Sequence, residues 1–133
     1  MLKLVAAYFT TLIVMLGLDL VWLGVVAKKM YANALGSLLA DSPNIPAAVA
    51  FYVLYPLGVL IFVVSPSLAA GSWMQALVRG ALFGFFGYMT YEFTNLALIR
   101  SWPSSIVVAD IVWGIALTGV MATAGHFAGK WVG

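Results

Sequence analysis

Four long blocks of apolar residues, separated by short polar segments, organise the chain. They cover residues 4–27, 45–64, 73–99 and 104–128. A transmembrane helix needs about 20 mostly apolar residues, and each block meets that length. The pattern therefore predicts an all-α fold, a four-helix bundle that spans the membrane as one domain over residues 1–133.

The segments between the blocks carry residues that interrupt or begin helices. Residues 28–29 are two lysines, and Pro43 and Pro46 frame the start of the second block, where proline is tolerated in a first helical turn. The Ser-Pro-Ser segment 65–67 is predicted to end the second helix, and residues 100–104 separate the third from the fourth. Both chain ends are therefore expected on one side of the bundle.

The first connector, residues 28–44, is long enough to hold a short helix of its own. Its apolar residues gather near one face, whereas Tyr31, Asn33 and Ser37 are more polar. This pattern is typical of an interfacial helix that lies on the membrane, and an ordered connector would also explain it. The apolar residues of that face are Met30, Ala34, Leu38 and Leu39.

The first block also has features of a secretory signal peptide. Lys3 precedes it, and Val25 and Ala27 resemble a cleavage site. A signal-peptide core usually has about 7–15 apolar residues, whereas this block is longer and contains Asp19. We therefore expect a retained transmembrane helix.

Composition supports a membrane protein. Hydrophobic residues make up 65% of the chain and charged residues only 8%, against roughly 25% charged in soluble domains. With no cysteine, the chain can form no disulfide and no thiolate metal site. A net charge of +2 gives no reason to expect nucleic acid. Three basic residues fall on each side of the predicted bundle, so the positive-inside rule assigns no orientation.

Three carboxylates from three predicted helices should lie at one depth in the membrane. Asp19 lies about 12 Å before the end of its block, Glu92 about 10 Å before the end of its block, and Asp110 about 9 Å after the start of its block. All three distances are measured from the side that carries residues 28–44 and 100–104. A charged side chain facing lipid costs several kcal/mol, so these acids should face the bundle interior.

Helical spacing places each acid in a stripe with aromatic and small residues. The stripes are Tyr8, Thr11, Met15, Asp19 and Trp22; Gly84, Tyr88, Glu92 and Asn95, flanked by Tyr91 and Thr94; and Asp110, Trp113, Gly114 and Thr118. The second block adds Tyr52, Tyr55 and Pro56 at similar depth. The predicted intramembrane polar site comprises Asp19, Glu92, Asp110, Trp22, Tyr52, Tyr55, Tyr88, Tyr91, Asn95 and Trp113.

No basic residue lies at the depth of the acids. Arg79 is about 20 Å from Glu92 along one helix, and only the rim cations Lys28, Lys29 and Arg100 could reach down. Three acids in one site cannot all stay charged without counter-ions, so a proton or a cation should sit among them. No resident cofactor is expected. The alternative is structural: the acids bond to Tyr or Trp donors, or, for Asp110, to free backbone N–H groups.

Glycine pairs four residues apart suit close helix packing, at Gly80 with Gly84 and at Gly125 with Gly129. His126 lies near the opposite membrane face from the acids and is expected at the interface rather than as a ligand. The segments Asp-Leu-Val-Trp (19–22) and Asp-Ile-Val-Trp (110–113) look alike, but their helices run antiparallel. We therefore expect no relation between them.

The common catalytic motifs are absent from the sequence. There is no glycine-rich phosphate loop, no HExxH and no nucleophile elbow. A single histidine without cysteine excludes the usual zinc sets. Acid–base chemistry by two carboxylates stays open, but no catalytic residue is assigned.

Six short motifs are spread over nearly the whole chain. They are Asp19-Leu-Val-Trp22-Leu-Gly24, Pro43-Asn44, Phe51-Tyr52, Tyr91-Glu92-Phe-Thr94-Asn95-Leu-Ala97, Trp102-Pro103 and Asp110-Ile-Val-Trp113-Gly114. Together they resemble a family of small bacterial inner-membrane proteins known as domain of unknown function, family 2177. The family's pattern has Asp where this chain has Glu92, which keeps the carboxylate and lengthens its reach. The resemblance implies a bacterial source, the inner membrane and four helices, and it implies no activity.

Three functions fit the sequence. The first is proton- or cation-coupled transport of a small or amphipathic molecule, with pairing to another copy because four short helices enclose little space. The second is lipid binding or lipid modification at the acid layer, and the third is an accessory subunit of a larger membrane complex. The partners expected are the lipid bilayer and either a second copy or a membrane-complex partner.

Overall fold

The computed structural model describes residues 1–40 and 42–133, and within these ranges the chain is helical with no strand. The prediction of an all-α membrane chain is confirmed by its long apolar helices. The elements are α1 (Leu2–Val21), η1 (Trp22–Val26), α2 (Lys28–Leu35), η2 (Gly36–Leu38), α3 (Ile45–Val59), η3 (Leu60–Val64), α4 (Ser65–Ala70), α5 (Trp73–Leu98) and α6 (Ser104–Val132). Of these, η1 and η3 are π-helical turns and η2 is a 3₁₀ turn.

Three continuous helical stretches are long and apolar enough to cross a membrane: Leu2–Val26, Ile45–Ala70 and Ser104–Val132. The fourth predicted helix, α5, has 26 residues but is less apolar. Its C-terminal half carries Glu92 and Asn95 among tyrosines and threonines, which lower its mean hydropathy. A fourth crossing therefore stays a prediction.

The second predicted helix does not end at residues 65–67. It continues through η3 into α4 and ends at Ala70, where Gly71 adopts a left-handed conformation with φ of 65°. Pro66, which has no N–H to donate, lies directly after the π-helical turn η3, in the first turn of α4. The Ser67 hydroxyl donates to the Val64 carbonyl at 2.7 Å, which satisfies a backbone oxygen at this irregular turn.

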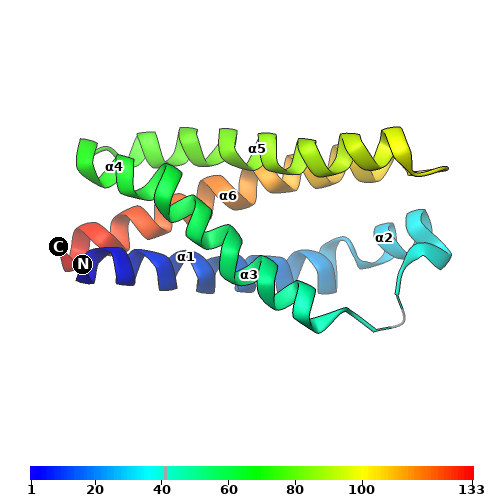
Figure 1. Cartoon of the computed structure of the whole chain (residues 1–133), viewed down its shortest axis with the longest axis horizontal. Coiled ribbons are helices and arrows are strands. Elements are labelled where there is room, and N and C mark those ends of the chain that lie inside the picture. The colour runs from blue at the N-terminus through cyan, green and yellow to red at the C-terminus, as the bar shows by residue number, and fades with distance from the viewer. Residues whose placement is uncertain (41) are drawn as a thin grey trace.

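The short helix predicted in the first connector is present as α2, followed by η2. It lies at the end of the bundle formed by the C-terminal ends of α1 and α5 and the N-terminal ends of α3 and α6 (Figure 1), which carries Asp19, Glu92 and Asp110. We call this the acid end. Its position at a membrane surface remains a prediction.

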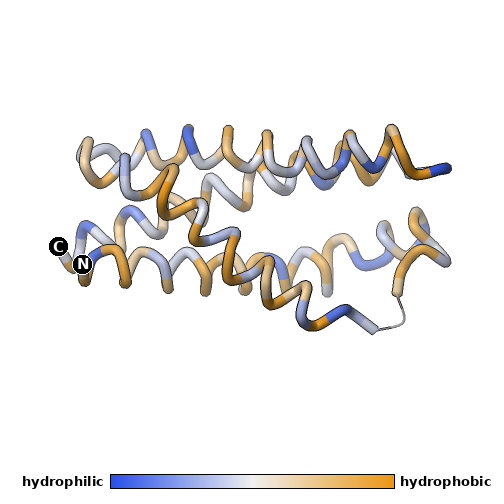
Figure 2. The backbone as a smooth tube through the Cα atoms, in the orientation of Figure 1, coloured by the Kyte–Doolittle hydropathy of each residue, from blue (hydrophilic) through white to orange (hydrophobic). Residues whose placement is uncertain are grey.

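Helix α6 is the centre of the bundle, packed against α5 along one side and α1 along another. In Figure 1, α3 crosses α1 obliquely and diverges from α5 toward the acid end. Both termini lie together at the opposite end, as predicted (Figure 1). Figure 2 shows mostly hydrophobic tubes, with hydrophilic positions near the ends of the helices and at a few interior points.

Close packing of α6 depends on both predicted glycine pairs. A Cβ at Gly84 would overlap the Gly114 carbonyl and the Thr118 side chain, and one at Gly80 would meet the Thr118 carbonyl. A Cβ at Gly125 would strike the Thr11 side chain of α1. Such contacts allow the backbones to approach, as small residues do between membrane helices.

The placement of His126 at an interface was wrong. Its side chain is buried between α6 and α4, with Nδ1 at 2.9 Å from the Ser67 hydroxyl. The unexpected extension of the second helix into α4 carries Ser67 to this position, and the hydroxyl gives the imidazole a polar partner. His126 remains far from the acid end.

Candidate functional site

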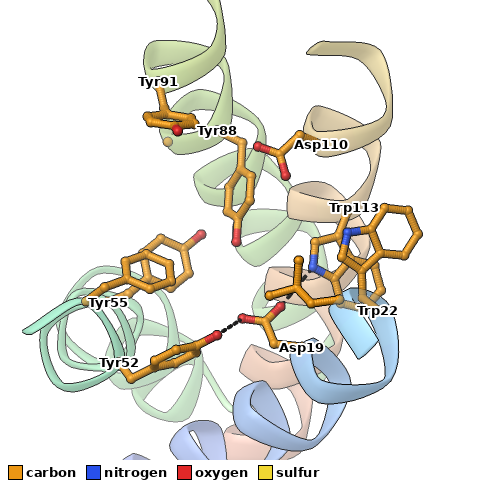
Figure 3. Close-up of a pocket in the computed structure, with 11 residues that line it drawn as sticks. Asp19, Trp22, Tyr52, Tyr55, Tyr88, Tyr91, Asp110 and Trp113 are labelled. Carbon is orange, nitrogen blue, oxygen red and sulfur yellow. Dashed lines mark hydrogen bonds between the residues drawn. The ribbon is translucent and has the colours of Figure 1, made fainter. Parts of the chain in front are cut away.

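A cavity of about 550 Å³ opens among four helices at the acid end (Figure 3). This volume lies within the range of small-molecule sites, roughly 300–1,000 Å³. The residues that line it are Asp19, Trp22, Leu23, Phe51, Tyr52, Tyr55, Gly87, Tyr88, Tyr91, Asp110 and Trp113.

Asp19 is bound by donors from two other helices. Tyr52 of α3 donates from its hydroxyl to Oδ2 at 2.7 Å, and Trp113 of α6 donates from Nε1 to Oδ1 at 2.9 Å (Figure 3). Helical spacing brings Asp19 inward in line with the buried Thr11 and Met15. Tyr and Trp donors across helices are the partners that the structural alternative predicts. They satisfy the carboxylate and leave it 6% exposed, at the wall of the cavity.

Asp110 takes its donor from the first connector. The Tyr31 hydroxyl of α2 donates to Asp110 Oδ1 at 2.9 Å, and Trp22 Nε1 lies 3.5 Å from the same hydroxyl. Backbone N–H groups were an expected alternative partner, but Asp110 lies in the second turn of α6, past the free N–H groups of the first turn.

Glu92 lies behind the cavity rather than in its wall. Its side chain is 1% exposed, and Trp102 of the connector after α5 donates from Nε1 to Oε2 at 3.0 Å. Glu92 and Asp110 are close enough for their charges to interact.

The two Asp-x-Val-Trp segments meet in the structure. The rings of Trp22 and Trp113 stack with centroids 4.6 Å apart and an interplanar angle of 4°. Each Trp is also linked by hydrogen bonds to the acid of the other segment. Trp113 donates directly to Asp19, whereas Trp22 donates to the Tyr31 hydroxyl, which in turn donates to Asp110. Antiparallel helices at one depth can place equivalent residues face to face, which the linear comparison could not show.

The remaining predicted residues differ in their relation to the cavity. The Tyr55 hydroxyl lies 2.7 Å from the Thr118 hydroxyl, and Tyr88 points into the space between Tyr55 and Asp19 (Figure 3). Tyr91 lies at the rim, with its ring edge-on to Trp102. Asn95 lies beside Tyr91 and does not line the cavity. Whether these residues form a functional site stays a prediction.

The wall of the cavity contains acids and no basic residue in the described chain. Lys28, Lys29 and Arg100, which the sequence suggested as counter-ions for the acids, therefore do not line the cavity. Within residues 1–40 and 42–133, no three Asp, Glu or His side chains are gathered in a way that could hold a metal ion. The acids are arranged instead as one carboxylate with two donors and one carboxyl pair.

Tyr31 stays a hydrogen-bond donor because its environment opposes ionisation. Burial raises the pKa of the Tyr31 hydroxyl well above its ordinary value; the hydrogen bond from Trp22 offsets part of this rise, and the charge of Asp110 adds to it. The hydroxyl therefore keeps its proton and links α2 to Asp110 across the accessible pH range.

A family model described as "Predicted membrane protein (DUF2177)" matches residues 4–127. The chain belongs to this family. The match confirms the resemblance drawn from the motifs. The matched range of this DUF2177 protein includes both Asp-x-Val-Trp segments and every residue of the cavity wall. No match was found among curated proteins or solved structures.

Sequence reasoning missed Tyr31 and Trp102 of this DUF2177 protein as partners of the acids. Both lie in connectors, outside the blocks whose periodicity defined the stripes. A usable signal was present: each is an aromatic hydrogen-bond donor on the side of the bundle where the acids lie. Because no basic residue lies at the depth of the acids, aromatic donors on that side of the bundle are the nearest hydrogen-bond partners for the buried carboxylates.

Replacing Tyr31 with phenylalanine is expected to loosen α2. A hydrogen bond to a charged group contributes about 1.5–3 kcal/mol, so amide hydrogen exchange over residues 28–38 should accelerate by about tenfold or more. Tyr8→Phe is a matched control because the Tyr8 hydroxyl donates to the Val53 carbonyl, away from α2. Equal exchange rates over residues 28–38 in wild type and Tyr31→Phe would contradict the role assigned to this bond.

Proposed function

We propose that this protein carries a small or amphipathic molecule across a bacterial inner membrane, coupled to protons or cations. The proposal includes a fourth crossing by α5 and pairing with a second copy to complete the path. The observation that carries it is the cavity of about 550 Å³ with Asp19 and Asp110 in its wall. Ionisable residues within membrane helices commonly mark substrate and ion pathways.

The hydrogen bonds of the acids support coupling. The donors from Tyr52 and Trp113 suit an ionised Asp19, because a carboxylate accepts at both oxygens. Neighbouring carboxyls can share one proton, and Glu92 and Asp110 are close enough for their charges to interact. A cation entering the cavity would stabilise further negative charge there and favour release of that proton, so solute and proton would compete for one site.

The rim of the cavity favours lipid binding as a second candidate function. Phe51 of α3 is 41% exposed and Tyr91 of α5 is 56% exposed, and both line the cavity. These exposed rings lie on α3 and α5, the helices that diverge toward the acid end, and in this proposal the cavity opens between them. A lipid could enter sideways from the bilayer and remain bound without being transported.

Flux in proteoliposomes tests transport. Purified protein is reconstituted with a pH dye trapped inside, and organic amines, zwitterions and fatty acids are presented outside under an imposed pH gradient. At least one class should drive proton movement above that of protein-free liposomes. Asp19→Asn should reduce this movement by at least about tenfold, because a neutral amide cannot exchange a proton for a cation.

Phe86→Ala is the control for this assay, since Phe86 is an exposed aromatic residue of α5 that does not line the cavity. It should retain wild-type flux. Equal flux in wild type and Asp19→Asn would refute coupling through this carboxylate. Bound lipid in purified protein without flux of any solute would favour the second candidate.

A further inference from the structure

The wall of the cavity selects a ligand by charge. Asp19 and Asp110 contribute carboxyl groups, and no Lys, Arg or His of the described chain lines it. Glu92 adds a third carboxyl directly behind Asp110. An anion would enter a low-dielectric space next to like charges, at a cost that nothing in the wall offsets. The wall is therefore complementary to positive charge.

The rest of the wall is built from aromatic rings. Trp22 and Trp113 stack on one side, and tyrosines from α3 and α5 face them across the cavity (Figure 3). Aromatic faces attract cations, tryptophan most strongly, and they also bury the apolar body of a ligand. The rings are Trp22, Trp113, Phe51, Tyr52, Tyr55, Tyr88 and Tyr91.

Asp19 has hydrogen-bonding capacity left for such a ligand. Each of its oxygens accepts one bond, from Tyr52 or from Trp113, and each carboxylate oxygen can accept about two. The two donors also hold the carboxylate in place, so little ordering is required when a ligand arrives. An N–H donor or a quaternary cation beside Asp19 would lie near the tryptophan pair.

A bare inorganic cation fits this cavity less well. A small ion would fill little of about 550 Å³, and the aromatic wall offers it few oxygen ligands. The described residues hold no group of three acidic or His side chains arranged for a metal. The volume and the rings instead match an organic molecule of drug-like size.

We propose that the ligand is a lipophilic organic cation, with one positive centre beside Asp19 and an apolar body among the aromatic rings. This inference names the class of solute for the proposed transport function. It rests on that function only where the ligand is said to cross the membrane. Binding itself requires no transport. The opening between α3 and α5 lets such a molecule enter from the bilayer, where lipophilic cations accumulate.

Two probes of equal shape and opposite charge test the class. Purified protein in nanodiscs is titrated with tetraphenylphosphonium and, separately, with tetraphenylborate, by equilibrium dialysis against empty nanodiscs. The cation should bind saturably and the borate should not. Asp19→Asn should weaken cation binding by at least about tenfold, as expected when one partner of a buried charge pair is removed. Phe86→Ala should bind like wild type.

Ring contacts are tested by Tyr88→Phe and Tyr88→Leu. The first keeps the ring and should retain cation binding within about threefold, whereas the second removes the ring and should weaken it by about fivefold or more. Equal binding of the two probes, no saturable binding of the cation, or unchanged binding in Asp19→Asn would overturn the proposal.

The outcome separates this inference from the proposed function. Asp19-dependent cation binding without proton-coupled flux would support the ligand class and refute transport. Proton-coupled flux of a zwitterion or neutral solute, with no binding of the cation, would support transport and refute the ligand class. Folding of each variant is checked by its elution volume and helical circular dichroism before binding is compared.

Discussion

Replacing Gly84 with valine is expected to lower the free energy of unfolding by about 3 kcal/mol, the upper part of the range for overpacking a well-packed core. A Cβ at Gly84 overlaps the Gly114 carbonyl and the Thr118 hydroxyl, and backbone atoms cannot move aside as a flexible side chain would. Helices α5 and α6 must separate to admit the new side chain. The measurement is reversible unfolding in mixed micelles with increasing SDS.

Gly17→Val is the matched control, because a Cβ at Gly17 of α1 meets no atom within 4 Å. It should change the free energy of unfolding by less than about 0.5 kcal/mol, as surface substitutions usually do. If Gly84→Val and Gly17→Val unfold at the same SDS fraction, close packing at Gly84 does not stabilise the bundle. Separation of α5 from α6 should also move Tyr88 away from the cavity, since the Tyr88 ring packs on Gly114.

Trp113→Leu is expected to lower the free energy of unfolding by about 3 kcal/mol, from the lost packing of a half-buried aromatic ring together with the lost hydrogen bond to a buried carboxylate. The change removes the ring that stacks on Trp22 and the N–H that donates to Asp19. The carboxylate then keeps only Tyr52 as donor in a nonpolar surrounding. Leaving a buried charged acceptor without a partner costs more than the bond contributes.

A double-mutant cycle separates the two losses. Asp19→Asn and Trp113→Leu together should cost about 1–2 kcal/mol less than the sum of the single changes, because the amide has no charge to leave unpartnered. Trp131→Leu is the control, since Trp131 is 91% exposed at the end of α6 and should be neutral. Additive effects would show that the contact between Trp113 and Asp19 contributes nothing to stability.

The long helices could be predicted from the sequence because a bilayer imposes a simple rule. Inside a bilayer there is no water to bond the backbone, so a segment of about 20 apolar residues satisfies its own N–H and C=O groups by forming a helix. This reasoning placed the three helical stretches that are long and apolar enough to cross a membrane, as well as α5, and it placed the acids at one end. It failed at residues 65–67, because a Ser-Pro-Ser segment ends a helix only if no π-turn and no side-chain bond continue it.

The residues of the cavity could be predicted in part. Periodicity identified Asp19, Tyr88 and Trp113, because residues three or four apart share a helix face, and depth along the second block identified Tyr52. It also included Asn95, which lies beside the cavity rather than in its wall. Periodicity shows which residues share a helix face, but it cannot show where along that face the cavity ends. Asn95 lies one helical turn beyond Tyr91, past the end of the cavity wall.

The sequence by itself determined a helical membrane protein with three acids at one depth and no base to neutralise them. Local composition and the 1.5 Å rise of a helix are enough for that result. Only the tertiary structure decided how the acids are satisfied: Asp19 by donors from α3 and α6, Asp110 by Tyr31, and Glu92 by Trp102. These partners are separated by up to 94 residues in the chain, so they depend on how the helices rotate and cross.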